Sequence, residues 1–322
     1  MKLFFQSYTV KIIALALAVS AIVLVYLTYK TYGNWEFALA LRGSKVLAFV
    51  FVGIAATFAT ISFQTMTQNH FLTPNILGLD SLYVFIQTIL FFFLGGNQLL
   101  GQETLGTFLL NVLLMVAVSS LLSLFLLKKS SNDLFLLLMV GIILGTFFTS
   151  ISTFLQVVMD PNEYDLLQGK LFASFGNVNS QYLLIAGVFI IGLVAYLWIK
   201  SSTLDVLHLG KEQAISLGVN VGRFQFILLL VISSLVALST ALVGPVTFLG
   251  FIVANMSYQL LGTYNHRQLF LGGSLLAIFL LVAGQWLVEQ VFQLNTTLSI
   301  VIEFVGGIYF VGKIISERKQ QV

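Results

Sequence analysis

The sequence contains no cysteine, and this absence excludes thiolate metal sites, disulfide bonds and cysteine nucleophiles. Histidine and proline are also scarce, with three of each, so we expect no His-rich metal cage and no bound metal. Charged residues make up 8% of the chain, whereas about 25% is usual for a soluble domain. So few charges cannot cover a globule of this size, which excludes an ordinary water-soluble enzyme. The net charge of +3 is too small and too scattered for nucleic-acid binding.

Hydrophobic residues dominate instead, at 58% of the chain, and the mean hydropathy is +1.01. A chain of this kind lies in a membrane, where backbone polar groups must be paired internally, so only helices or a closed barrel can span it. The apolar residues form long uninterrupted runs and not the ten-residue alternating segments of a barrel. We therefore expect an all-α polytopic membrane protein.

Charge-free runs predict where the transmembrane helices lie, because a helix needs about 20 apolar residues to cross the hydrocarbon. Residues 12–29 are too long for a signal peptide and lack its small-residue cleavage site, so we interpret them as an uncleaved first helix. No hydrophilic stretch is long enough for a soluble domain, so residues 1–322 are expected to form a single transmembrane domain. The ten expected spans are 12–29, 46–66, 76–95, 105–127, 134–155, 180–199, 224–243, 247–261, 268–288 and 297–315.

An even number of spans puts both termini on one side of the membrane. Cytoplasmic termini leave eleven Lys and Arg residues inside and four outside, in agreement with the positive-inside rule. The inner residues are Lys2, Lys11, Lys128, Lys129, Lys200, Lys211, Arg223, Arg267, Lys313, Arg318 and Lys319. The outer residues are Lys30, Arg42, Lys45 and Lys170. Arg42 and Lys45 are an exception to this excess of positive charge on the inside. Two basic residues so close together on the outer side indicate a functional role.

The loop of residues 204–220 lies on the cytoplasmic side in this topology. It carries small and apolar residues between polar ones, and Gly210 and Gly218 mark where helices end. This pattern predicts short amphipathic helices. One interpretation is a connector that lies on the membrane surface. The other is a docking element that presents an apolar face to a cytoplasmic partner.

Two interruptions of the apolar pattern are candidates for a transport pathway. Gln64 and Asn69 lie in a polar stretch between two spans, where polar groups cost free energy unless they are paired or face water. This stretch is either an ordinary turn or irregular backbone that lines a pathway. Gly244, Pro245 and Gly250 likewise indicate either a broken or re-entrant helix or a tight hairpin.

Glu303 falls in the middle of the last expected span. An intramembrane carboxylate is either a functional group or a hydrogen-bonded group at a helix interface. Close by, Gly307-x4-Gly312-Lys313 mimics a phosphate-binding loop, but Ile314 replaces the Ser or Thr that meets magnesium, and no strand precedes it. We therefore expect no nucleotide site on this chain.

In order and spacing, these segments resemble the FecCD (BtuC-like) family of ABC transporter permeases, over about residues 41–313. The family has R-L-P-R at the start of its second span, Q-x4-N-P-L-A-x-P-x-L-L-G after it, L-G-x3-A-x2-L-G-V in the cytoplasmic loop, and G-P-I-x-F-V-G-L-I further on. The matching stretches here are Arg42-Gly43-Ser44-Lys45, Gln64 to Gly78, Leu209 to Val219, and Gly244 to Ile252.

The sequence also departs from the family pattern. Asn255 stands where the family has His, Ala254 replaces a Pro, and Asp80 replaces a small residue. These departures resemble a divergent branch of the family, in which the chain forms half of a heterodimeric permease for ferric catecholate siderophores.

The resemblance implies the type II ABC importer permease fold, a location in the bacterial cytoplasmic membrane, and a role for each segment. Arg42 and Lys45 match positions that dock an extracellular or periplasmic binding protein carrying the ferric siderophore. Residues 204–220 would insert into a groove of a cytosolic ABC ATPase, with contacts at Gly210, Ala214, Leu217 and Gly218. The translocation path and gate would include Gln64, Asn69, Asp80, Gly244, Pro245, Gly250 and Asn255.

On this reading the chain is a transport subunit and not an enzyme. ATP and magnesium would bind to the partner ATPase, and this chain would hold no cofactor. Two alternatives stay open: a haem or vitamin B12 permease of the same family, or a secondary transporter coupled to ions through Glu303 or Asp80.

Overall fold

The computed structural model describes residues 8–31, 35–96, 105–129, 134–172, 174–176, 178–294 and 296–320, and this part of the chain is helical, without strands. Of the inner charges counted above, Lys2 lies outside the described residues, as do the side chains of Lys128, Lys129, Arg318 and Lys319. The elements are α1 (Tyr8–Thr28), α2 (Trp35–Thr67), η2 (Pro74–Leu77), α3 (Leu79–Leu94), α5 (Leu105–Lys129), α6 (Leu134–Val158), α7 (Pro161–Leu171), α8 (Ser180–Ile199), α9 (Ser201–His208), α10 (Lys211–Ser216), α11 (Val221–Val243), α12 (Leu249–Leu261), α13 (His266–Gln290) and α14 (Leu298–Gln320).

Each of the ten expected spans is occupied by a helix. Among the described residues, seven helices are long and apolar enough to cross a membrane, and three shorter apolar ones occupy the other positions. Two of the short helices, α3 and α12, follow segments where the α-helical structure is interrupted. They therefore cover only part of the spans expected at 76–95 and 247–261. At the other extreme, α2 begins at Trp35 and extends well beyond the span expected at 46–66.

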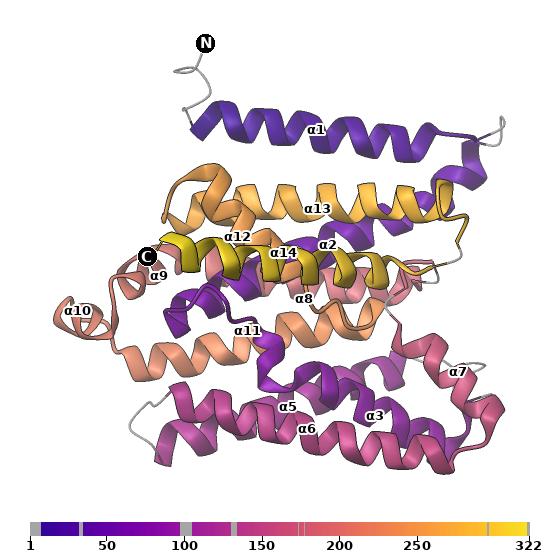
Figure 1. The fold of residues 1–322 in the computed structure, drawn as a ribbon, viewed down its shortest axis with the longest axis horizontal. Helices are drawn as coiled ribbons and strands as arrows, with labels where there is room; N and C mark the ends of the chain where they lie inside the picture. Colours follow the sequence, from indigo (N-terminus) through magenta and orange to yellow (C-terminus); the bar gives the residue numbers. More distant parts are fainter. Residues whose placement is uncertain are drawn as a thin grey trace.

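The long helices run side by side, and the two ends of this bundle differ (Figure 1). One end, here called the α10 end, carries α9 and α10, and both the start of α1 and the end of α14 lie there. The opposite end, called the α7 end, carries the short helix α7. This arrangement places both terminal helices with their outer ends on one side, as an even number of spans requires.

Several helices begin where a short polar side chain caps the backbone. The side chain of Asp160 accepts a hydrogen bond from the amide of Asn162 at the start of α7. Asn179, Asn220 and Asn265 cap α8, α11 and α13 in the same way. Such caps satisfy amide groups that have no partner within the helix, and they therefore fix where the helix starts.

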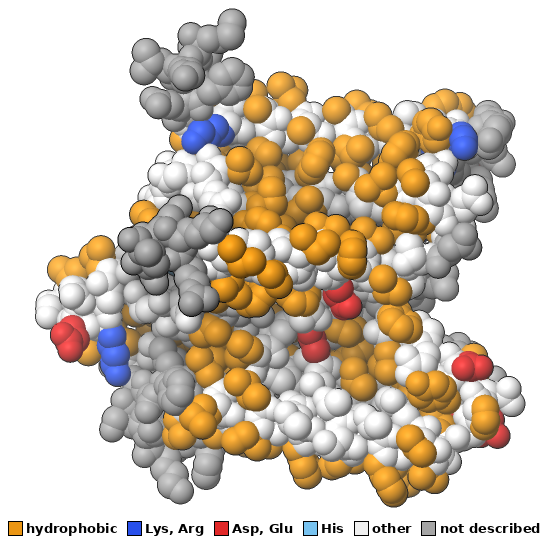
Figure 2. Space-filling model, viewed as in Figure 1, with side chains coloured by type: hydrophobic (Ala, Val, Ile, Leu, Met, Phe, Trp, Pro, Cys, Tyr) orange, Lys and Arg blue, Asp and Glu red, His pale blue; other side chains and the backbone are white. Residues whose placement is uncertain are grey.

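The core of the bundle surrounds α2, which packs against α1, α8, α9, α11, α12 and α13. Phe58 of α2 stacks on Phe270 of α13 with ring centroids 4.0 Å apart. The outer helices instead expose apolar side chains, such as Leu17, Phe154 and Leu184, each at least 62% exposed. Figure 2 shows hydrophobic side chains spread over much of one face. A surface of this kind suits lipid and not water.

Candidate functional site

Two breaks in the helical bundle meet each other across the structure. One joins α2 to α3 through Thr73–Gly78, and the other joins α11 to α12 through Gly244–Phe248. The Thr247 hydroxyl donates a hydrogen bond to Asp80 Oδ2 at 3.2 Å, and Asn75 Nδ2 donates to the Thr247 carbonyl at 3.4 Å. Residues of both breaks line a cavity of about 30 Å³, which has room for water.

Glycines determine the course of the chain at these breaks. Gly78 has φ +77°, and a Cβ there would lie 3.0 Å from the Gly141 carbonyl oxygen and from Gly145 Cα on α6. Only glycine combines that backbone angle with so close an approach of two helices. At the second break Gly244 has φ +91°, and Pro245 follows it without an amide hydrogen to continue the helix.

The predicted path residues fall into two groups. Asp80, Gly244 and Gly250 line the cavity between the breaks, and Pro245 lies within the second break beside them. Oδ1 of Asp80 is buried and has no hydrogen-bond partner within the described part of the chain. This carboxylate oxygen therefore lacks a protein donor beside a cavity that has room for water.

The second group lies nearer the α10 end, around the carbonyl oxygen of His70. Gln64 Nε2 donates to this oxygen at 2.6 Å, and Asn255 Nδ2 donates to it at 3.2 Å. The Asn69 side chain accepts from the Phe71 amide at 2.8 Å and so shapes the same turn. Asn69, His70 and Asn255 line a pocket of about 320 Å³, and Gln64 lies behind it through its bond to His70.

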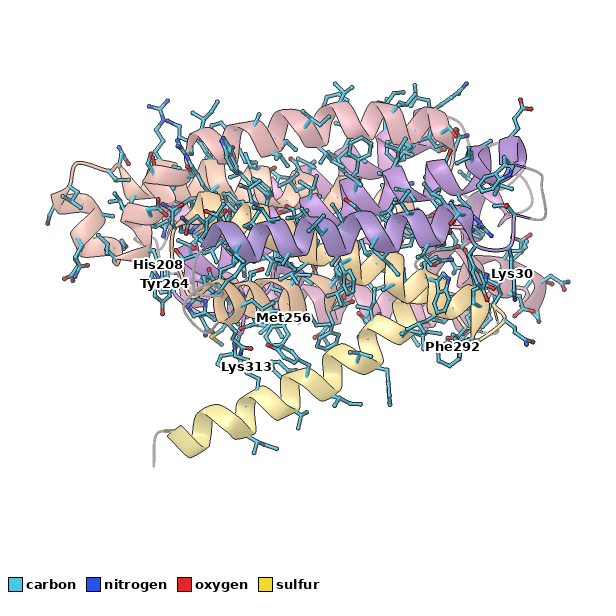
Figure 3. All side chains as sticks on the ribbon, turned by 90° about the horizontal axis from the view of Figure 1, so that it is seen from above. Lys30, His208, Met256, Tyr264, Phe292 and Lys313 are labelled. Carbon is cyan, nitrogen blue, oxygen red and sulfur yellow. The ribbon has the colours of Figure 1, made fainter. Side chains whose placement is uncertain are left out.

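Asn255 also links this group to α14, because Lys313 Nζ donates to its Oδ1. Seen from above, α14 diverges from the other helices, and Lys313 lies between α14 and the bundle, with Met256 of α12 nearby (Figure 3). Glu303 is an exposed residue of this helix. Figure 2 shows acidic side chains in the middle of this face.

A hydroxyl-lined hollow on α6 was missed by sequence reasoning. It measures about 530 Å³ and lies between α6 and the turn that precedes α3. Thr149 donates to the Ser81 hydroxyl at 3.1 Å across it. Thr146, Ser150 and Thr153 continue the polar stripe along α6, and all three are exposed. Their spacing of three and four residues was the signal in the sequence that could have revealed it.

At the α7 end, the two residues predicted to dock a binding protein are engaged within the chain. Arg42 Nη1 donates to the carbonyl oxygens of Tyr26 at 2.9 Å and Tyr29 at 2.7 Å. These two hydrogen bonds satisfy backbone carbonyl groups at the C-terminal end of α1. Lys45 Nζ lies 2.9 Å from Glu289 Oε1 of α13. Lys45 also lines a pocket of about 290 Å³ between α2 and the start of α8. Both side chains thus join α2 to its neighbours at the surface expected to dock.

At the opposite end, the predicted coupling loop folds as α9 and α10. Gly210 and Gly218 flank α10 with φ of +114° and +85°. The side chain of Ala214 is fully buried, so it supports α10 from below and does not form its surface. The exposed large apolar residues of this loop are Leu209, Ile215 and Leu217, which are 60%, 54% and 63% exposed. A partner would therefore meet these three residues, and Ala214 lies beneath them.

A polar network that sequence reasoning missed lies directly behind α10. The Asp205 carboxylate of α9 accepts hydrogen bonds from both the ring and the backbone of His266. Burial acts to raise the pKa of Asp205, but these two hydrogen bonds outweigh it and hold that pKa below its usual value. Asp205 is therefore ionised at neutral pH.

The model of the FecCD transport family matches residues 2–316 of this chain. The petrobactin import system permease protein YclO of Bacillus subtilis is 42% identical over 308 residues, which cover 95% of this chain and 98% of YclO. The petrobactin import system permease protein FatC of Bacillus anthracis is 36% identical over 85% of this chain and 77% of its own length.

Among solved structures, a metal-chelate type ABC transporter in an inward-facing conformation superposes with a TM-score of 0.84. The match covers 96% of this chain and 99% of that one, at 22% sequence identity. The two chains therefore share one fold.

Proposed function

Because this chain belongs to the FecCD transport family, we propose that it is one permease subunit of a bacterial ABC importer whose cargo is a ferric siderophore of the catecholate type. The observation that carries this proposal is the 42% identity to a petrobactin import permease over 95% of the chain. The comparisons do not favour the haem, vitamin B12 or ion-coupled alternatives. The chain is a multi-pass membrane protein and a transport subunit, and it makes and breaks no covalent bond.

A second permease subunit is part of the proposal, because one face of this chain is too polar for lipid. The exposed hydroxyls of α6 and the exposed carboxylate of Glu303 lie within the expected spans. Ionisable groups at that depth normally face water or a partner. A second subunit opposite this face would enclose a water-filled path between the two chains.

The energy would come from a cytosolic ABC ATPase that binds ATP and magnesium and contacts α10. Exposed apolar side chains such as Leu217 stand outside the expected spans, as a docking surface requires. This assignment places the α10 end, and with it both termini, in the cytoplasm. ATP binding would favour one of two packings of the subunits, and hydrolysis would restore the other.

The siderophore-binding protein would dock at the α7 end, beside Arg42 and Lys45. Its carboxylates would be attracted to the two positive charges, and a guanidinium orients a carboxylate better than an ammonium does. Within the described part of the chain, the carbonyl contacts of Arg42 are all made by Nη1. Further donors of the guanidinium are thus available to a docking carboxylate.

Reconstitution of the complete importer into liposomes tests this proposal, with uptake of radioactive iron as ferric petrobactin as the measurement. We expect uptake that requires ATP and the binding protein and that persists after an uncoupler abolishes the proton gradient. A ferric hydroxamate serves as the control cargo and should not accumulate. Uptake that follows the proton gradient without ATP would show a secondary transporter instead.

A further inference from the structure

The short helix α10 transmits force to the membrane bundle through few elements. It packs against α9 and α11. In turn α9 packs against α2, α8 and α13. A displacement imposed on α10 by a partner would therefore reach the path mainly through α9 and α11.

Polar contacts fasten α9 to two of these long helices. Asp205 Oδ1 accepts from His266 of α13, at 2.6 Å from Nδ1 and 2.8 Å from the backbone amide. Gln68, which follows α2, donates to the Leu207 carbonyl at 2.9 Å. Arg267 Nε donates to the Ser201 hydroxyl at 3.0 Å.

Among these contacts, the imidazole of His266 is central, because it joins three helices at once. Its Nδ1 meets Asp205 on α9, and its Nε2 lies 2.7 Å from Thr65 Oγ1 on α2, while the residue itself begins α13. An ionised carboxylate only accepts, so Nδ1 carries a proton. Both ring nitrogens are thus committed to opposite neighbours.

Burial excludes other roles for this side chain. His266 is fully buried, so it cannot touch the ATPase, the binding protein or a passing cargo. Among the described residues no cluster of His, Asp or Glu is arranged to hold a metal ion. Phe270 packs edge-on against the ring, with centroids 5.8 Å apart. The group therefore acts within the structure.

We propose that His266 is a positioning residue that locks α9 to α2 and α13, so that ATPase movement at α10 is transmitted to the transport path. This inference rests on the proposed function, since it needs an ATPase at α10. Without the lock, α9 would shift against the bundle and part of the ATPase movement would be lost before it reached the path.

The test measures the number of ATP molecules hydrolysed for each ferric petrobactin imported by the complete importer in liposomes. We expect His266→Ala to raise this ratio by roughly tenfold, a coupling loss within the range found for residues between sites. Asp205→Asn, which keeps a hydrogen-bond acceptor but loses the charge, should raise it less. Ser257→Ala is the matched control, because within the described part of the chain that fully buried hydroxyl bonds to Val253 of its own helix and to no other helix. A ratio unchanged in His266→Ala overturns the proposal.

A rescue separates positioning from a general loss of stability. The chain has no cysteine, so the pair Asp205→Cys and His266→Cys can replace the hydrogen bond by a disulfide without competing thiols. We expect a high ratio when the pair is reduced and a clearly lower one when it is oxidised, because the disulfide restores the link of α9 to α13 but not the contact with Thr65 of α2. A cross-linked pair with the ratio of His266→Ala overturns the proposal. The wild-type importer is measured in parallel and tests the cargo. If the wild type takes up no siderophore, the proposed function is wrong, whereas the role of His266 is judged by the variants.

Discussion

At the scale of single residues, the α7 end shows how a charge predicted for docking also serves the fold. Glu289 Oε1 accepts from Lys45, from the Tyr26 hydroxyl at 3.0 Å and from Gln285 at 2.9 Å. Because Lys45 and Glu289 are only 16% and 12% exposed, water replaces these contacts poorly. The pair therefore fastens α1, α2 and α13 together.

A charge swap tests this ion pair. Lys45→Glu alone should lower the stability of the protein by about 1–3 kcal/mol, since it leaves Glu289 without its cation and opposes it with a like charge. The double variant Lys45→Glu/Glu289→Lys should recover most of that loss. Thermal unfolding of the purified protein in detergent is the measurement. Equal melting temperatures for the wild type and Lys45→Glu would contradict the role of the pair.

Charge reversal at Arg42 tests docking at the same surface. Arg42→Glu should weaken binding of the siderophore-binding protein by at least roughly tenfold, because attraction to its carboxylates becomes repulsion. The control is Lys30→Glu, which reverses an exposed charge at the same end and should change affinity little. Affinity is measured with the assembled importer in nanodiscs. Similar losses in both variants would indicate general electrostatic attraction and not a specific site.

The sequence predicted positions along the chain better than contacts between distant residues. The spans could be located because charge-free runs mark them, and the break at Gly244 and Pro245 could be found because those residues interrupt helices. The bond of Thr247 to Asp80 joins residues far apart in sequence, and no local pattern encodes it. For the same reason Arg42 was predicted only as a docking residue, although it also closes the last turn of α1.

At the scale of elements, α12 depends on a close approach to α2. A Cβ at Gly250 would overlap the Thr60 hydroxyl and lie 3.1 Å from its Cβ. Thr60 is only 3% exposed, so an added methyl group at Gly250 can be accommodated only if the Thr60 side chain moves. The start of α12, and with it the cavity between the two breaks, is therefore fixed by this glycine.

Gly250→Ala should destabilise the protein by about 1–3 kcal/mol through overpacking. Adding Thr60→Ala should restore part of the loss by removing the overlapping hydroxyl. Gly192→Ala is the control, because no atom beyond its own helix lies within 4 Å of the position of its Cβ. Thermal unfolding measures all three variants. A stable single variant would show that α2 and α12 are not closely packed.

The helix α10 is the element proposed to contact the ATPase. Leu217→Asp should prevent stable association with the ATPase, since it places a charge in the centre of an apolar contact. Glu212→Gln changes a polar position on α10 that is also exposed and should leave association intact. Copurification with the ATPase measures the difference. Normal copurification of Leu217→Asp would place the ATPase contact elsewhere. Ala214→Trp should act differently, by displacing α10 from its own support.

At the scale of the whole molecule, the outer surface has two kinds of face. The outer helices expose apolar side chains that suit lipid, whereas the hydroxyl-lined hollow of α6 and the exposed carboxylate of Glu303 on α14 form a polar face within the expected spans. In a dimeric importer the polar face would be hydrated and the apolar face would not.

Labelling of single cysteines in this cysteine-free chain tests that difference. In the assembled importer, Ser150→Cys should react with a hydrophilic thiol reagent, because it lies in the hollow of α6. Leu184→Cys on α8 is the control, being 62% exposed on the apolar surface, and should react at least roughly tenfold more slowly, since charged reagents partition poorly into hydrocarbon. Equal reaction rates would place both residues in the same environment.

The length of α2 has one more consequence. This single helix of 33 residues is roughly 50 Å long, bears Arg42 and Lys45 near one extremity, and meets His266 through Thr65 near the other. A signal that cargo has arrived outside and a signal that nucleotide has bound inside would thus act on opposite ends of the same stiff rod. Docking of the binding protein at one end of α2 would therefore be mechanically linked to nucleotide binding at the other end.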